Sequence, residues 1–169
     1  MPSADNKQYQ KDLLMGENGE IDAHPLLEKR FGSLQRTKRY DRFDYKNEEC
    51  IIELKTRNCF SDSFDNDGGL MFNYSKIEKM KKKNDKRNTY FAFNCVDGLF
   101  IWKYDDKTFS TGMGGRIDRG CKEHRLMAKV KSKDLICLFK KKPDFPPYEK
   151  YRPQPLDDFL LMSSDDEEN

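Results

Sequence analysis

The chain has 169 residues, of which 36% are hydrophobic, 12% aromatic and 37% charged. This length predicts one domain of ordinary size with tails, and the aromatic side chains offset the lean apolar content because each buries a large surface. No apolar run approaches the roughly 18 residues of a membrane-spanning helix. The polar stretch Met1–Gln10 also lacks the apolar core of a signal peptide. We therefore expect neither a membrane protein nor a secreted one.

The charges are unevenly distributed along the chain. It contains 32 Lys and Arg and 30 Asp and Glu residues, for a net charge of +2. Six of the acids lie between Pro153 and Asn169, where there is no Lys or Arg, so residues 1–152 keep 24 acids against 32 bases and carry +8. A basic domain with an acidic tail predicts a polyanionic partner for the domain. A solvated surface of mixed charge is the competing interpretation.

Cysteine usage favours a reducing, intracellular compartment. The five cysteines are odd in number and show no CxxC spacing, which is typical of free thiols. Cys121 and His124 form a single CxxH without a second ligand pair, so we do not expect zinc. His24 has no serine or cysteine partner that would make it part of a catalytic triad.

The N-terminal part predicts a leader followed by one helix. Residues 1–11 are polar and are expected to be disordered. We place the helix from about Ile21 or Asp22 to Arg30, because Gly32 fits a C-cap and Pro25 is best accommodated in a first turn. Residues 33–39 form either a short strand or a basic loop.

A β-hairpin follows, and it carries the most informative polar residues. We predict strands at residues 40–45 and 50–55, joined by a polar turn at 46–49. Because side chains alternate along a strand, Glu53 and Lys55 should share one face, with Asp44 opposite them on the partner strand. The neighbours of Glu53 are apolar, and burying three charges together is costly unless they neutralise one another or bind a metal.

The next segment reads as a polar loop and then a lysine-rich helix. The loop at 56–69 is rich in Asp, Asn and Gly but lacks the spacing of a calcium loop. Apolar residues recur at helical spacing over residues 70–84, with lysines on the other side. Those lysines form either a solvated helix face or a rim that meets nucleic-acid phosphates.

The remaining elements are a second hairpin and less regular segments. Residues 90–96 and 99–104 flank Asp97-Gly98, which suits a type I′ turn, and their aromatics favour a core over base stacking. The glycine-rich stretch at 107–120 matches no phosphate-binding loop and is interpreted as a flexible basic loop. Residues 126–130 suggest an edge strand and 134–139 a short helix or strand.

These elements predict an α/β domain over residues 12–142. We expect a mixed sheet of four or five strands with helices on both faces, followed by a tail at 143–169 that is first proline-rich and then acidic. Apolar residues inside the acidic end suit a short motif that becomes ordered on a protein partner. A purely solubilising tail remains the alternative.

In this arrangement the chain resembles the PD-(D/E)XK nuclease superfamily, and especially short nuclease-like proteins of large DNA viruses of eukaryotes. The resemblance spans residues 20–139 and rests on Asp44, Glu53 and Lys55 in the order Asp-(x8)-Glu-x-Lys. Further shared segments are Glu53-Leu-Lys-Thr-Arg-Asn58, Asn73-Tyr-Ser-Lys-Ile-Glu-Lys79, Tyr90-Phe-Ala-Phe-Asn94, Asp97-Gly-Leu-Phe100 and Arg116-Ile-Asp-Arg119. One departure is Phe43, which stands where the family often has proline before the first acid.

The resemblance implies a restriction-endonuclease-like core and a magnesium site, with manganese as a substitute. Asp44, Glu53 and the Leu54 carbonyl would hold the ion, and Lys55 would orient the attacking water. A helix glutamate often completes the site. Glu20 is our choice by position, with Glu17 and Glu28 as rivals. The residues expected to contact nucleic acid are Arg57, Tyr74, Lys76, Lys79, Lys83, Arg116 and Arg119.

The sequence therefore leads to one functional hypothesis and one alternative. The first is a Mg²⁺-dependent endonuclease acting on DNA, located in the host cytoplasm, a viral factory or the nucleus, or packaged in a virion. Cutting of both strands by one such site would favour a homodimer. The alternative is a catalytically silent nuclease fold that serves as a nucleic-acid-binding or virion-associated scaffold.

Overall fold

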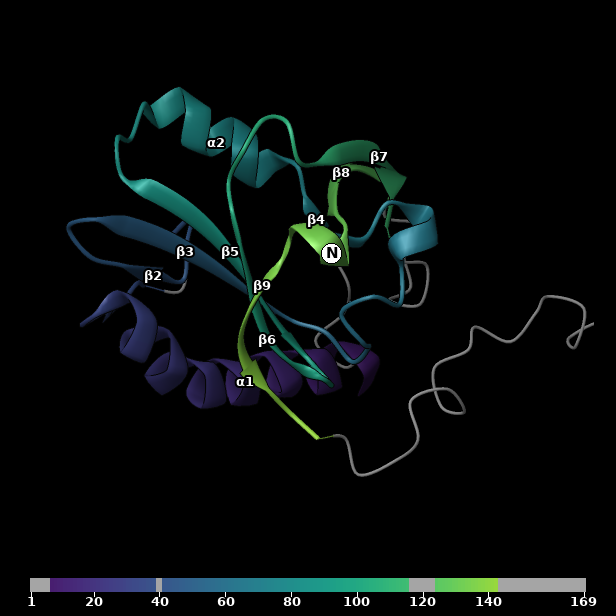
Figure 1. The fold of residues 1–169 in the computed structure, drawn as a ribbon, viewed down its shortest axis with the longest axis horizontal. Helices are drawn as coiled ribbons and strands as arrows, with labels where there is room; N and C mark the ends of the chain where they lie inside the picture. Colours follow the sequence, from purple (N-terminus) through teal and green to yellow (C-terminus); the bar gives the residue numbers. More distant parts are fainter. Residues whose placement is uncertain (1–6, 39–40, 116–123, 143–169) are drawn as a thin grey trace, which may run out of the picture.

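The computed structural model describes residues 7–38, 41–115 and 124–142, which form two β-sheets and two helices (Figure 1). The six-stranded sheet has the order β1 (Gln35–Arg36), β2 (Tyr45–Lys46), β3 (Cys50–Thr56), β5 (Asn88–Cys95), β6 (Gly98–Lys103), β9 (Ile136–Lys140). The three-stranded sheet has the order β4 (Leu70–Asn73), β8 (Arg125–Val130), β7 (Ser110–Gly114). The helices are α1 (Lys7–Phe31) and α2 (Ser75–Lys83), and single 3-10 turns lie at Asp65–Asp67 and Ser132–Asp134.

The larger sheet is mixed, as predicted, but it has more strands than expected. Strands β3 and β5 are parallel, and every other neighbouring pair in it is antiparallel. The chain returns from β3 to β5 through β4 and α2, because parallel strands need a crossover connection. The expected four or five strands become six, with a second sheet of three, since β1 and β9 extend the edges and β4 pairs outside this sheet.

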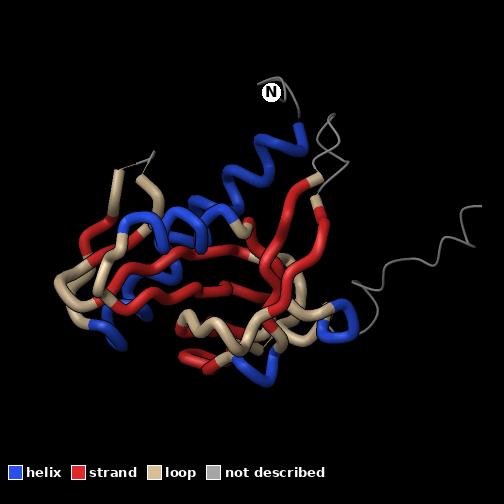
Figure 2. Tube along the Cα trace, turned by 90° about the horizontal axis from the view of Figure 1, so that it is seen from above, coloured by secondary structure: helices blue, strands red, loops and turns tan. Residues whose placement is uncertain are grey.

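The two faces of the larger sheet bury separate cores. On one face, α1 covers Ile52 and Leu54 of β3. On the other face, Ile51 belongs to a core that contains residues of α2 and of the smaller sheet. Figure 1 shows α1 and α2 on opposite sides of the sheet, and Figure 2 shows the strands in red between helical segments in blue. Burial on both faces explains the continuous apolar run of β3.

Helix α1 begins much earlier than predicted. It starts at Lys7, so residues 7–11 of the expected leader are helical, while residues 1–6 lie outside the described residues. Pro25 is inside the helix and not in its first turn. Gly19 would weaken an isolated helix, but here it allows close packing, because a Cβ there would overlap the Thr56 side chain. Tertiary contact with β3 therefore overrides the local breaker signals.

The predicted helix at 70–84 is a strand followed by a shorter helix. Leu70 and Phe72 are buried and alternate with less buried residues, and β4 pairs antiparallel with β8. Helix α2 begins only at Ser75, whose N–H donates to the Asn73 side chain (3.0 Å). It ends at Lys83, and the capping residue Asn84 adopts a left-handed conformation.

The two predicted hairpins are present with altered details. In the first, β3 matches the prediction, but the partner strand β2 contains only Tyr45 and Lys46. The second joins β5 and β6, and its loop residues Val96 and Asp97 have no positive φ, so the type I′ prediction is wrong. Its aromatics lie in the core, where Phe91 stacks on Phe72 with ring centroids 4.1 Å apart.

Three further expectations change near the C-terminus. β7 occupies part of the predicted loop, and β8 is the middle strand of its sheet and not an edge. β9 settles the open choice for that segment as a strand. The tail at 143–169 lies outside the described residues. In the described part of the chain, no helix has the length and apolarity needed to cross a bilayer.

Candidate active site

The first hairpin brings Asp44 next to β3. The Asp44 N–H donates to the Ile52 carbonyl (3.0 Å), and its carbonyl accepts from the Thr37 N–H (2.9 Å). Its side chain points across the hairpin, where Oδ2 accepts the Leu54 N–H at 2.7 Å. The backbone thus fixes this carboxylate beside the residue that follows Glu53.

Glu53 is buried at the centre of a charged cluster. Only 1% of this residue is exposed. Lys55 Nζ lies 2.6 Å from Oε1, and Lys76 Nζ lies 3.1 Å from Oε2. Lys76 also donates to the Arg42 carbonyl. Two ammonium groups therefore offset the cost of burying the carboxylate, and Asp44 adds a second negative charge nearby.

The environment raises the pKa of Asp44 from 3.8 to about 6. The largest cause is burial, which disfavours the charged form, followed by repulsion from Glu53. The hydrogen bond from Leu54 and the charge of Lys55 act in the opposite direction, and Glu20 adds a weak repulsion. A carboxyl whose pKa is raised by burial and by a neighbouring carboxylate is typical of functional sites.

Glu20 lies at the margin of this cluster. Its carboxylate pairs with Arg36, and its carbonyl accepts a hydrogen bond from the Tyr45 hydroxyl (3.1 Å). Burial, with a smaller contribution from Glu20, raises the pKa of that tyrosine to about 12. Of the rivals, Glu28 accepts the Leu34 N–H (3.0 Å), and Glu17 is exposed on α1. Among the three, Glu20 is the one whose charge acts on Asp44.

The donor atoms suit magnesium in kind. Within the described residues, no group of three or more His, Cys, Asp or Glu side chains is placed to hold a metal. Asp44 and Glu53 are a pair, and Mg²⁺ is commonly bound through one or two carboxylates with water and substrate oxygens completing its shell. Leu54 donates its N–H to Asp44 Oδ2.

The predicted nucleic-acid contacts fall into different environments. Tyr74 precedes α2 and packs against the core near Phe109, with ring centroids 6.3 Å apart. Arg57 donates to the Met71 carbonyl (2.8 Å) and so fastens β3 to β4. Lys76 forms an ion pair with Glu53, so its ammonium group is not simply solvated on the helix surface. Lys79 and Lys83 line a cavity beside the cluster, and Arg116 and Arg119 lie outside the described residues.

The sequence alone does not reveal that Lys76 is the second lysine bound to Glu53. The predicted helix begins at Leu70, so Lys76 falls among its other lysines and its position in the first turn of α2 is not apparent from the sequence. The segment Asn73-Tyr-Ser, in which Asn73 accepts the Ser75 N–H, marks the true helix start and was the available signal. Comparison of the chain with protein-family models, curated proteins and solved structures gave no match.

Proposed function

We propose that this chain is a Mg²⁺-dependent endonuclease that hydrolyses DNA phosphodiester bonds. The observation that carries the proposal is the convergence of Asp44 and Glu53 with two lysines. A carboxylate pair supplies oxygen ligands for a hard cation, and adjacent ammonium groups supply charge for a phosphate. A surface ion pair would need neither this burial nor this number of charges.

The order of the elements supports a restriction-endonuclease-like core. A helix, a short strand and a hairpin are followed by a crossover helix and a strand parallel to β3. The acidic pair belongs to the hairpin, and Lys76 belongs to the crossover helix. These are the elements to which the resemblance assigns the site.

Each residue has a distinct role in the proposed reaction. Asp44 and Glu53 would hold the metal, which when bound acidifies water and screens the phosphate oxygens. Lys55 donates to Glu53 Oε1 and retains 29% side-chain exposure, so its remaining N–H groups can orient the attacking water or meet a phosphate oxygen. Lys76 keeps the second oxygen of Glu53 in place and adds positive charge beside the scissile group.

Nicking of supercoiled plasmid tests the proposal. The purified chain should convert plasmid to open-circular or linear DNA in magnesium, and EDTA should stop the reaction. Asp44→Ala, Glu53→Ala and Lys55→Ala should each abolish it, because each removes a ligand or a charge at the reacting phosphate. Lys82→Ala, which removes an exposed cation of α2 that contacts none of these groups, is the matched control. Cleavage that survives Glu53→Ala would overturn the assignment.

The scaffold alternative is favoured by one observation. Both oxygens of Glu53 are engaged by lysines, and Glu20 is engaged by Arg36, so these two carboxylates are already neutralised by protein cations. Calorimetric titration with magnesium and with manganese separates the two functions. Heat of binding that Asp44→Ala removes supports the enzyme, whereas no metal binding together with salt-sensitive DNA binding supports the scaffold.

A further inference from the structure

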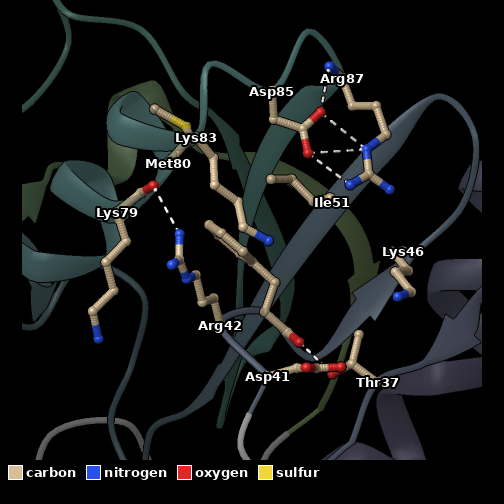
Figure 3. A pocket seen from close by; sticks show the side chains of 11 residues that line it. Thr37, Asp41, Arg42, Lys46, Ile51, Lys79, Met80, Lys83, Asp85 and Arg87 are labelled. Carbon is tan, nitrogen blue, oxygen red and sulfur yellow. Dashed lines mark hydrogen bonds and ion pairs between the residues drawn. The ribbon is translucent and has the colours of Figure 1, made fainter.

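A cavity of about 210 Å³ lies between the first hairpin and α2 (Figure 3). Its floor is apolar and consists of Phe43, Ile51 and Met80, each at most 9% exposed. Phenylalanine, isoleucine and methionine side chains offer no strong hydrogen-bonding group. The floor is therefore suited to a flat, apolar face and would not discriminate among ligands by polar contacts.

The sides of the cavity are strongly basic. The lining contains five cationic residues and two acidic ones: Arg42, Lys46, Lys79, Lys83 and Arg87, and Asp41 and Asp85. Arg87 donates two hydrogen bonds to Asp85, from Nε to Oδ1 at 3.0 Å and from Nη2 to Oδ2 at 2.6 Å. These bonds lower the pKa of Asp85 to about 2. Figure 3 shows this pair closed on itself at one end of the cavity.

The remaining cations are available to a ligand. In the described part of the chain, no carboxylate lies within ion-pair distance of Lys46, Lys79 or Lys83. The Arg42 guanidinium donates to the Lys79 carbonyl (3.3 Å), which positions it at the cavity and leaves its charge uncompensated. An apolar floor ringed by surplus cations fits a ligand with one flat apolar part and one anionic part.

The cavity and the carboxylate pair lie along one face of β3. Ile51 in the floor and Glu53 are two residues apart and point to the same side, a separation of about 7 Å that one nucleotide can span. Arg42 joins the two places, because its carbonyl accepts from Lys76 while its side chain lines the cavity. A ligand in the cavity therefore lies next to the proposed reaction centre.

We infer that this cavity binds one unstacked nucleotide, with its base on Phe43, Ile51 and Met80 and its phosphate on the surrounding lysines. The inference rests on the proposed function for the choice of nucleic acid as ligand. A base inside a duplex is paired and stacked and cannot enter such a cavity. The substrate class is then DNA with an unpaired nucleotide beside the cut: a single strand, a frayed end or a flap.

Binding in EDTA tests this without requiring catalysis. Fluorescence anisotropy would compare three labelled probes of equal length: a single strand, the same backbone with abasic sites in place of bases, and a duplex. Stacking of one base is worth about 1–3 kcal/mol, so the single strand should bind at least about fivefold more tightly than the abasic strand. Equal affinities for these two probes would overturn the inference, since they carry the same charge.

Variants separate the floor from the rim. Phe43→Leu removes the aromatic face of the floor without changing charge and should weaken the preference for the strand that has bases. Lys46→Gln and Lys83→Gln should each weaken single-strand binding by more than Lys82→Gln, which removes the same charge from the neighbouring position of α2 outside the cavity. Equal losses for Lys82→Gln and Lys83→Gln would reduce the cavity to an ordinary basic surface and contradict the assignment.

Competition identifies the source of the nucleotide. Displacement of the single strand by millimolar dAMP, and not by inorganic phosphate, would show that a free nucleotide fills the cavity. Failure of both competitors while the base preference persists would indicate a nucleotide within a strand. Equal competition by phosphate and dAMP would overturn the inference, because the floor would then contribute nothing. Because no metal is present, these outcomes are independent of whether the plasmid test succeeds.

Discussion

Asp44→Asn should stabilise the fold at neutral pH, in contrast to most substitutions of a partly buried residue. The folded pKa of Asp44, about 6, exceeds the ordinary value of 3.8, so between these pH values the folded chain binds more protons than the unfolded chain. Its carboxyl therefore subtracts from stability as pH rises through this window, and the full penalty is present above about pH 6. Asparagine carries no charge and keeps an oxygen that can accept the Leu54 N–H.

The expected magnitude follows from the same two pKa values. At about 1.4 kcal/mol per pH unit, the difference between 3.8 and about 6 corresponds to about 3 kcal/mol. Asp44 is only partly buried, so residual solvent makes this an upper limit and about 2 kcal/mol is a realistic gain. Near pH 4 the gain should approach zero, because the wild-type carboxyl is then mostly neutral in the folded state.

Urea unfolding in EDTA at pH 4 to 8 would measure the effect. Trp102, the one tryptophan of the chain and 2% exposed, reports unfolding by fluorescence. Asp85→Asn is the matched control with the opposite sign. The Arg87 hydrogen bonds lower the pKa of Asp85 to about 2, so its loss should destabilise the fold equally at every pH above about 5. A gain for Asp44→Asn that does not change between pH 4 and 8 would refute the reasoning.

Two further sets of substitutions test the cluster and the packing of α1. Lys76→Met leaves Glu53 with one lysine and should cost about 3 kcal/mol, less when combined with Glu53→Gln, and a double-mutant cycle in urea would give the coupling. Additive costs would show that the two side chains do not interact. Gly19→Ala should destabilise by about 1–3 kcal/mol because its methyl group meets Thr56, with partial recovery in Thr56→Ala. Gly16→Ala, where the added methyl meets nothing within 4 Å, should instead stabilise by up to about 1 kcal/mol. Thermal melts would measure Gly16→Ala, Gly19→Ala and the Gly19→Ala variant that also carries Thr56→Ala. If the two glycine substitutions had the same effect, the placement of the helix would be wrong.

The elements that the sequence predicts well are those with sustained local patterns. Strand β3 is a continuous apolar run interrupted by Glu53, and β5 and β6 are rich in aromatic and aliphatic residues on either side of a short turn. Each pattern spans at least six residues and is reinforced by pairing with a neighbour in sequence or with a parallel strand. Propensity and tertiary structure agree in these segments, so a sequence-based interpretation suffices.

The elements that it misses depend on distant partners. The strand character of β4 exists because Leu70 pairs with Val130 and Phe72 pairs with Ala128, far along the chain. The N-terminal half of α1 contains two glycines and exposes Leu14, so its local signals oppose a helix. Contacts between elements that are remote in sequence decide both cases, and no window of neighbouring residues contains that information.

The residues of the candidate site fall into the same two groups, those placed by local patterns and those placed by distant contacts. Asp44, Glu53 and Lys55 were found because strand alternation and a short hairpin bring them together locally. Lys76 and Arg42 were not assigned to the cluster, because their positions depend on the crossover that carries α2 back over the sheet. Local hairpin geometry thus positions the buried carboxylate, whereas tertiary packing of α2 brings Lys76 to it.

The position of Lys76 on α2 also predicts a coupling between the charged cluster and the cavity. Lys76 connects the cluster with the edge of the cavity, since its ammonium bonds Glu53 and the Arg42 carbonyl and lies 5.9 Å from the Phe43 ring centroid. A metal held by Glu53 would compete with the lysines for its carboxylate oxygens, and a base on Phe43 would lie near the Lys76 ammonium. Binding at either place therefore changes what Lys76 contacts at the other. The two ligands should accordingly influence each other's affinity, and Lys76→Met should uncouple magnesium binding from nucleotide binding while leaving each site its own direct contacts.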